Sequence, residues 1–86
     1  MLHEYRKKTT IKAEQFDGSN EMLNKYLVVV LGTLTRGKVI DGCPCVLKTK
    51  EGAMNLHLGD WIATGIDGEH WVIANDIFRR TYERCD

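Results

Sequence analysis

The sequence has no apolar stretch approaching the length of about 20 residues that crosses a bilayer. Its longest unbroken apolar run, 27–31, is interpreted as a core element. The N-terminus lacks the apolar centre of a secretion signal, and 12 acidic residues balance 12 basic ones. No global field therefore draws the chain to membranes or nucleic acid. We expect a cytoplasmic protein with no membrane association, in which any nucleic-acid binding comes from a local patch.

Cysteine is scarce and odd in number. Cys43 and Cys45 are separated by one residue, and Cys85 stands next to the end of the sequence. A Cys-x-Cys pair is poorly placed to bridge itself, and an odd count is typical of a reducing compartment. Structural zinc sites usually combine two ligand pairs, and no matching second pair is present. We expect free thiols, no metal site and no cofactor, with His57 and His70 as exposed strand residues.

The composition is that of an ordinary globular protein. The chain has 86 residues, of which 43% are hydrophobic and 28% charged, and it shows no internal repeat or low-complexity tract. A chain of this length has room for one hydrophobic core. We expect a single domain spanning residues 1–86.

The first half predicts a strand, a helix and an irregular segment. Residues 9–16 begin with β-branched residues, which favour a strand. Residues 20–31 carry apolar side chains at helical spacing, with Ser19 or Asn20 as a candidate N-cap and Gly32 as a candidate stop. Residues 31–44 predict a loop or irregular hairpin.

The second half predicts an antiparallel meander over residues 45–74. Its strands alternate apolar and polar residues and are separated by turns such as Asp67-Gly68. Asn75 or Asp76 is expected to cap a single helical turn, after which 81–84 return as a strand. The fold class is α+β: a small bent antiparallel sheet or open barrel with one packed helix, at 20–31. The expected core contains Leu23, Leu27, Met54, Leu56, Leu58, Ile62, Ile66, Val72, Ile73 and Phe78, anchored by Trp61, Trp71 or both.

No pattern indicates catalysis. Asp60, Asp67 and Asp76 stand at turns or caps, where a short polar side chain satisfies local backbone donors. The nearby glycines lie between strands, unlike a phosphate-binding loop, which runs from a strand into a helix. Asn55 occupies the place where a biotin or lipoate carrier domain needs its modified lysine. We expect a protein that is not an enzyme and has no catalytic or cofactor-binding residues.

Several short motifs at both ends of the chain are found together in one kind of protein. They are Tyr5 to Lys8, Ile11 to Phe16, Glu51-Gly52, Gly59 to Ile62, Gly65 to Glu69, Asp76 to Phe78 and Thr81 to Glu83. In these residues the chain resembles a family of small phage and prophage proteins of unknown activity. Thr9 and Leu58 stand where such proteins often have proline. The resemblance implies an accessory gene product acting in a bacterial host and supplies no biochemical activity.

Protein binding and nucleic-acid binding are the two functions that the sequence leaves open. A small sheet has edge strands whose backbone groups can pair with another chain, so binding to a host or phage protein is favoured, with self-association as a variant. The alternative is nucleic-acid binding by a basic patch that forms if the first and last strands pair, with an exposed tryptophan to stack on a base. The residues of that patch are Arg6, Lys7, Lys8, Lys12, Arg79, Arg80 and Arg84.

Overall fold

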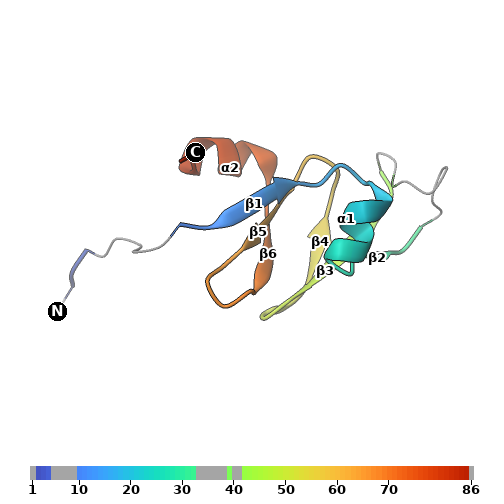
Figure 1. Ribbon diagram of the computed structural model, residues 1–86, viewed down its shortest axis with the longest axis horizontal. Coiled ribbons are helices and arrows are strands. Elements are labelled where there is room, and N and C mark those ends of the chain that lie inside the picture. The colour runs from blue at the N-terminus through green and yellow to red at the C-terminus, as the bar shows by residue number, and fades with distance from the viewer. Residues whose placement is uncertain (1, 5–9, 33–38, 40–41, 86) are drawn as a thin grey trace.

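The computed structural model describes residues 2–4, 10–32, 39 and 42–85. These residues form antiparallel strands and two helices, in keeping with the α+β class (Figure 1). None of the helices in this described part is long and apolar enough to span a membrane.

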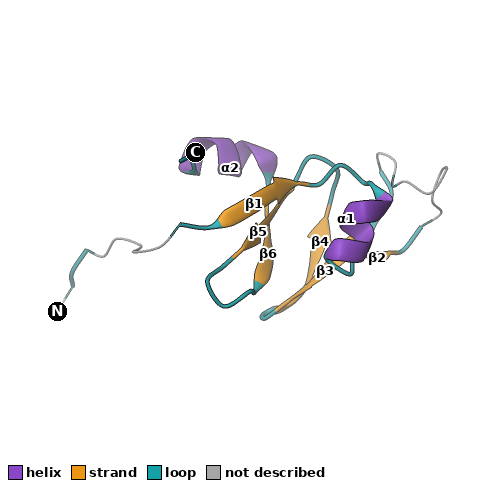
Figure 2. Cartoon of the chain, viewed as in Figure 1, coloured by secondary structure: helices purple, strands orange, loops and turns teal. Residues whose placement is uncertain are grey.

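The strands form two sheets of three strands, where the sequence predicts one bent sheet (Figure 2). The first has the order β1-β5-β6 and consists of β1 (Lys12–Gln15), β5 (Trp61–Thr64) and β6 (His70–Ile73). The second has the order β2-β3-β4 and consists of β2 (Val29–Val30), β3 (Cys45–Thr49) and β4 (Gly52–Leu56).

The expected meander is divided at Gly59. The β3–β4 and β5–β6 hairpins form as predicted, but β4 and β5 belong to different sheets. Gly59 has a φ of +91°, and its N–H donates to the Phe16 carbonyl, while the Phe16 N–H donates to the Asp60 carbonyl. The backbone hydrogen bonds at this corner therefore go to the segment before α1, and β5 continues alongside β1.

Helix α1 (Asn20–Lys25) is shorter than the predicted helix at 20–31. The Ser19 side chain accepts from the Met22 N–H at 3.3 Å, as expected of an N-cap. The helix ends before Gly32 because Leu27 adopts a left-handed conformation, with φ 54°. The Val28 N–H then donates to the Leu23 carbonyl at 2.9 Å, the bond that defines a Schellman end. The β-branched residues that follow form β2.

Helix α2 (Asn75–Thr81) is longer than the single turn predicted. Its N-cap is Ala74 and makes no side-chain capping bond, so the expected cap at Asn75 or Asp76 is wrong. The predicted strand at 81–84 is also absent from the described structure: Thr81 ends the helix and 82–85 have no regular structure. Figure 1 shows α2 above β1 and β5, with α1 at the other end of the molecule.

The core joins both sheets and α1. Leu23, Leu56 and Ile62 are buried as predicted. Leu27 and Ile66 are not: Leu27 is 79% exposed because it occupies the helix end, and Ile66 is 76% exposed because it follows β5 into the turn. Leu58 and Val72 pack against the core, while Met54, Ile73 and Phe78 are only partly buried. The buried cluster is Phe16, Met22, Leu23, Val39, Cys45, Leu47, Leu56 and Ile62.

Candidate functional site

Three aromatic rings form a column at the start of β5 and along α2. The rings of Trp61 and Phe78 stack with centroids 4.0 Å apart and planes 11° apart. Phe78 and Tyr82 stack at 5.2 Å and 23°. Residues four apart share a helix face, so the spacing of Phe78 and Tyr82 places both rings on the side of α2 that faces β5.

Asn75 fixes this column to the sheet. Its Oδ1 accepts hydrogen bonds from Trp61 Nε1 at 2.9 Å, Arg79 Nε at 3.2 Å and Gln15 Nε2 at 3.4 Å. The donors come from β5, α2 and β1. One amide oxygen in the first turn of α2 therefore links the helix to two adjacent strands.

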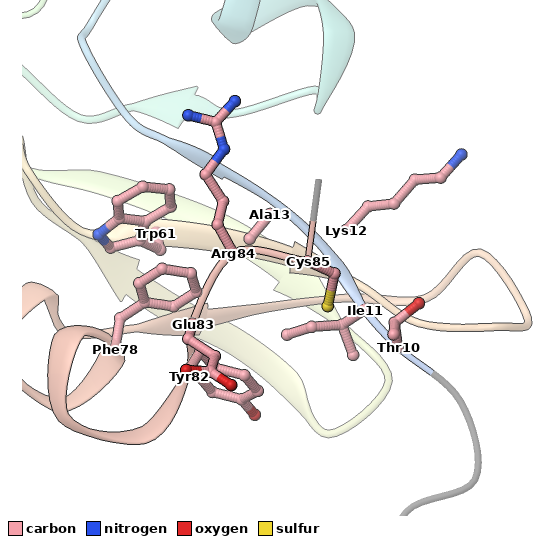
Figure 3. A pocket seen from close by; sticks show the side chains of 10 residues that line it. All are labelled: Thr10, Ile11, Lys12, Ala13, Trp61, Phe78, Tyr82, Glu83, Arg84 and Cys85. Carbon is pink, nitrogen blue, oxygen red and sulfur yellow. The ribbon is translucent and has the colours of Figure 1, made fainter.

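A groove runs between β1 and the end of α2. It has a volume of about 700 Å³, and its walls combine aliphatic and aromatic side chains, with charged groups at Lys12, Glu83 and Arg84 (Figure 3). The lining residues are Thr10, Ile11, Lys12, Ala13, Trp61, Phe78, Tyr82, Glu83, Arg84 and Cys85.

The groove lies on the sheet face that is remote from the main core. Directly opposed residues of antiparallel strands share a face, and the pairing Ala13↔Ala63 and Gln15↔Trp61 assigns these side chains to one face. Glu14 and Ile62 lie on the other face, where Ile62 joins the core. Helix α2 covers part of the groove face through Phe78.

A second, polar hollow of about 400 Å³ lies on the opposite side of β1. Glu14 Oε1 accepts from the Tyr26 hydroxyl at 2.5 Å and also binds Lys25 Nζ. The hydrogen bond from Lys25, followed by that from Tyr26, lowers the pKa of Glu14 below its ordinary value. Burial, followed by the bond to Glu14, raises the pKa of Tyr26.

The hollow is completed by β5 and β6. His70 Nδ1 and Thr64 Oγ1 lie 2.9 Å apart, and the Tyr26 ring meets the His70 ring edge-on at 5.0 Å. His70 is thus half-buried, not the exposed strand residue expected, whereas His57 is exposed and its Nδ1 lies 3.4 Å from Asp60 Oδ2. Lys12 and Ala13 line both the groove and this hollow.

The cysteines are all free thiols. Cys45 is buried, and burial is the main cause that raises the pKa of its thiol. Cys43 is half-buried and Cys85 is exposed at the groove. Within the described ranges, no group of three or more His, Cys, Asp or Glu side chains could hold a metal ion. Asp60 serves its turn as expected, accepting from the His57 N–H at 2.9 Å.

The predicted basic patch is only partly assembled. Lys12 and Arg84 line the same groove, while Arg79 and Arg80 are exposed on α2. The pairing of first and last strands that would bring them together does not occur, because Thr81 ends α2 and residues 82–85 form no strand. Three further members of the patch, Arg6, Lys7 and Lys8, lie outside the described residues.

Sequence reasoning did not identify the groove itself. Ile11 and Ala13 belong to the strand predicted at 9–16, but no local pattern places the end of α2 against that strand. Phe78 and Trp61 were assigned to the main core, and the available signal for a separate aromatic cluster was the four-residue spacing of Phe78 and Tyr82.

Comparison with protein-family models, with curated proteins and with solved structures gives no match.

Proposed function

We propose that this chain is a non-enzymatic protein-binding module that acts on a host or phage protein inside a bacterial cell. The observation that carries the proposal is the groove between β1 and α2, which has apolar walls, an aromatic column and charged residues at Lys12, Glu83 and Arg84. Concave apolar surfaces with a few polar groups are the usual form of binding sites.

The aromatic column favours protein over nucleic acid as the partner. A base stacks on the open face of a ring. Here Phe78 lies in the middle of the column and stacks on Trp61 and on Tyr82, so its two neighbours occupy the stacking positions. Aliphatic side chains of a partner protein can pack against the ring edges and against Ile11.

The arrangement of polar groups supports binding rather than catalysis. A catalytic site needs convergent polar groups directed at a reacting atom. In the polar hollow the Glu14 carboxylate is engaged by Lys25 and Tyr26, and His70 is engaged by Thr64. The bonds of Glu14 hold the end of α1 to β1, and the Thr64–His70 contact joins the paired strands β5 and β6.

Nucleic-acid binding is the second candidate, because Lys12 and Arg84 line one groove and Arg79 and Arg80 stand on the adjacent helix. Binding through such a patch weakens steeply as salt rises, since cations are released from the phosphates.

The two candidates separate in one experiment. The immobilised protein is exposed to lysate from bacteria with and without phage infection, with and without nuclease, beside the variant Tyr82→Ser. The proposal is supported if a lysate protein still binds the wild type after nuclease treatment and does not bind Tyr82→Ser. If the lysate proteins bound to the immobilised chain are lost after nuclease treatment, and purified DNA binds in a salt-sensitive way, the alternative is supported. Elution of the pure protein as a dimer that Tyr82→Ser separates would identify self-association as the function of this surface.

A further inference from the structure

Among the residues that the structure describes, no strand pairs with the outer edge of β1. Strand β1 is the terminal strand of the order β1-β5-β6. The Phe16 N–H donates to the Asp60 carbonyl at 2.7 Å. In an antiparallel ladder this direction alternates, so Lys12 and Glu14 also direct their backbone groups to β5. Ile11 and Ala13 therefore direct their N–H and C=O groups outward.

The two hollows flank this edge. The groove lies on one face of the first sheet, the polar hollow lies on the other, and Lys12 and Ala13 line both. Successive side chains of a strand point to opposite faces of its sheet. A strand added beside β1 would therefore place every second side chain toward the aromatic groove and the others toward the polar hollow.

The charge of the polar hollow favours an acidic side chain there. Its charged residues are Lys12, Lys25 and Glu14, accompanied by His70. Glu14 is already bound by Lys25 and Tyr26. Lys12 is exposed, and no carboxylate of the described residues lies within ion-pair distance of its Nζ. A carboxylate arriving at this position would meet a cation that none of the described carboxylates pairs.

We propose that the outer edge of β1 binds an extended acidic peptide segment as a fourth strand, with apolar and acidic residues alternating along the segment. The apolar side chains enter the groove beside Ile11 and the aromatic column. The acidic side chains lie on the opposite face near Lys12. Backbone hydrogen bonds to Ile11 and Ala13 supply the pairing, which is the usual mode of strand addition. The inference rests on the proposed protein-binding function and specifies its ligand.

The probe is a capped, fluorescein-labelled peptide that alternates leucine and aspartate, titrated with the whole protein by fluorescence anisotropy. Two comparison peptides alternate leucine with lysine and serine with aspartate. Three variants each remove one element of the recognition. Ala13→Pro removes the outward N–H and leaves the bonds to β5 in place, because proline is tolerated on a strand edge. Lys12→Glu reverses the charge at the polar hollow, and Ile11→Ser removes an apolar wall of the groove.

Matched controls keep the type of change and move it away from β1. Lys48→Glu reverses an exposed charge on β3, and Ile66→Ser removes an exposed isoleucine from the turn after β5. Unfolding in urea identifies any variant that has lost its fold. Ala13→Pro, Lys12→Glu and Ile11→Ser should each weaken binding of the leucine–aspartate peptide by about tenfold, which corresponds to about 1.4 kcal/mol. Both controls should bind the peptide as the wild type does. Lys12→Glu should also gain affinity for the leucine–lysine peptide.

Several outcomes would overturn the inference. The leucine–aspartate peptide could fail to bind, or could bind equally to folded Ala13→Pro and Lys12→Glu. Displacement of the peptide by single-stranded DNA at low salt would assign the groove to nucleic acid. A homodimer that Ala13→Pro dissociates would make a second copy the occupant. A nuclease-resistant partner from lysate that binds folded Ala13→Pro and Lys12→Glu unchanged would refute strand addition while protein binding remained.

Discussion

The indole N–H of Trp61 donates a hydrogen bond to Asn75 Oδ1 at 2.9 Å, and this contact joins the first turn of α2 to the start of β5. Gln15 and Arg79 donate to the same oxygen. The groove exists because α2 is held over this face of the sheet. Loss of the Asn75 hydrogen bonds should therefore both destabilise the protein and change the shape of the groove.

Asn75→Ala should lower the free energy of unfolding by about 1–2 kcal/mol, because it removes the acceptor from the half-buried Trp61 N–H. Asn75→Asp keeps an acceptor and adds a negative charge in the first turn of the helix, so it should retain wild-type stability or exceed it. Urea unfolding measures both. Asn24→Ala, at an exposed position on α1, is the control and should change the free energy by less than about 0.5 kcal/mol. Equal effects at Asn24 and Asn75 would contradict the anchoring role.

Leu27→Gly should stabilise the protein by about 1 kcal/mol. Leu27 has φ 54°, a left-handed conformation that is unfavourable for a residue with a Cβ atom. Its side chain is 79% exposed, so little packing is lost when it is removed. Leu31→Gly is the matched control: Leu31 is 65% exposed and does not have a positive φ, so added backbone freedom should destabilise the protein. Thermal unfolding gives both signs, and a destabilised Leu27→Gly would show that the Leu27 side chain makes a contact that matters.

Local sequence patterns predicted the hairpins of this fold but not how the hairpins are distributed. The strands of β3–β4 and β5–β6 follow from alternation and from turn residues close in sequence. The division into two sheets depends on β5 pairing with β1, a contact between segments far apart in the chain. The alternation of apolar and polar residues along a strand does not depend on which strand lies beside it. It therefore could not distinguish one bent sheet from two sheets.

At the end of the helix at 20–25, two tendencies compete. The apolar spacing favours a longer helix, and the β-branched residues favour a strand. The spacing of apolar residues continues through Val30, which favoured a helix to residue 31. The β-branched pair Val29–Val30 instead joins β3 as a strand, and Leu27 takes the left-handed conformation that frees the chain to do so. At the candidate site, the sequence predicted that Lys12 and Arg84 belong to one surface. That prediction depended on a pairing of β1 with residues 81–84, which does not occur. The contact between Phe78 and Trp61 is tertiary and has no local signature.

Stability should fall in mild acid in a manner that depends on Glu14. Its pKa in the folded protein lies below the ordinary value of 4.5, first because of the Lys25 hydrogen bond and then because of the Tyr26 bond. A depressed folded-state pKa gives a contribution that is fully present above the unfolded pKa and is lost as pH falls through the folded one. The Glu14 side chain is 44% exposed, so the contribution should not exceed about 1 kcal/mol.

The test compares urea unfolding of the wild type and Glu14→Gln from neutral pH downward. The difference in unfolding free energy should be constant above pH 4.5 and should shrink below it. A wild-type and Glu14→Gln pair whose difference stays constant through this range would contradict the role of the bonds from Lys25 and Tyr26.

Gly18→Ala should be among the most destabilising small substitutions in the protein. Gly18 has φ +76°, and a Cβ atom there would lie 2.7 Å from the Val39 carbonyl oxygen and 2.8 Å from Leu58 Cδ2. The Val39 N–H donates to the Gly18 carbonyl at 3.0 Å, so the two backbones cannot separate without breaking this bond. Gly68→Ala is the matched control, because Gly68 has a similar φ of +79° but its Cβ would meet nothing within 4 Å.

Both alanine variants include the conformational penalty of about 1 kcal/mol or more that a positive φ imposes on a residue with a Cβ atom. Only Gly18→Ala adds a steric conflict with backbone, which should raise its total loss to about 3 kcal/mol. Urea unfolding of the two variants isolates the difference, and equal losses would show that Val39 and Leu58 move away from the added Cβ atom without penalty. Because Val39 belongs to the buried cluster with Phe16 and Leu47, a large difference would establish that the absence of a Cβ atom at Gly18 allows Val39 to pack into the core.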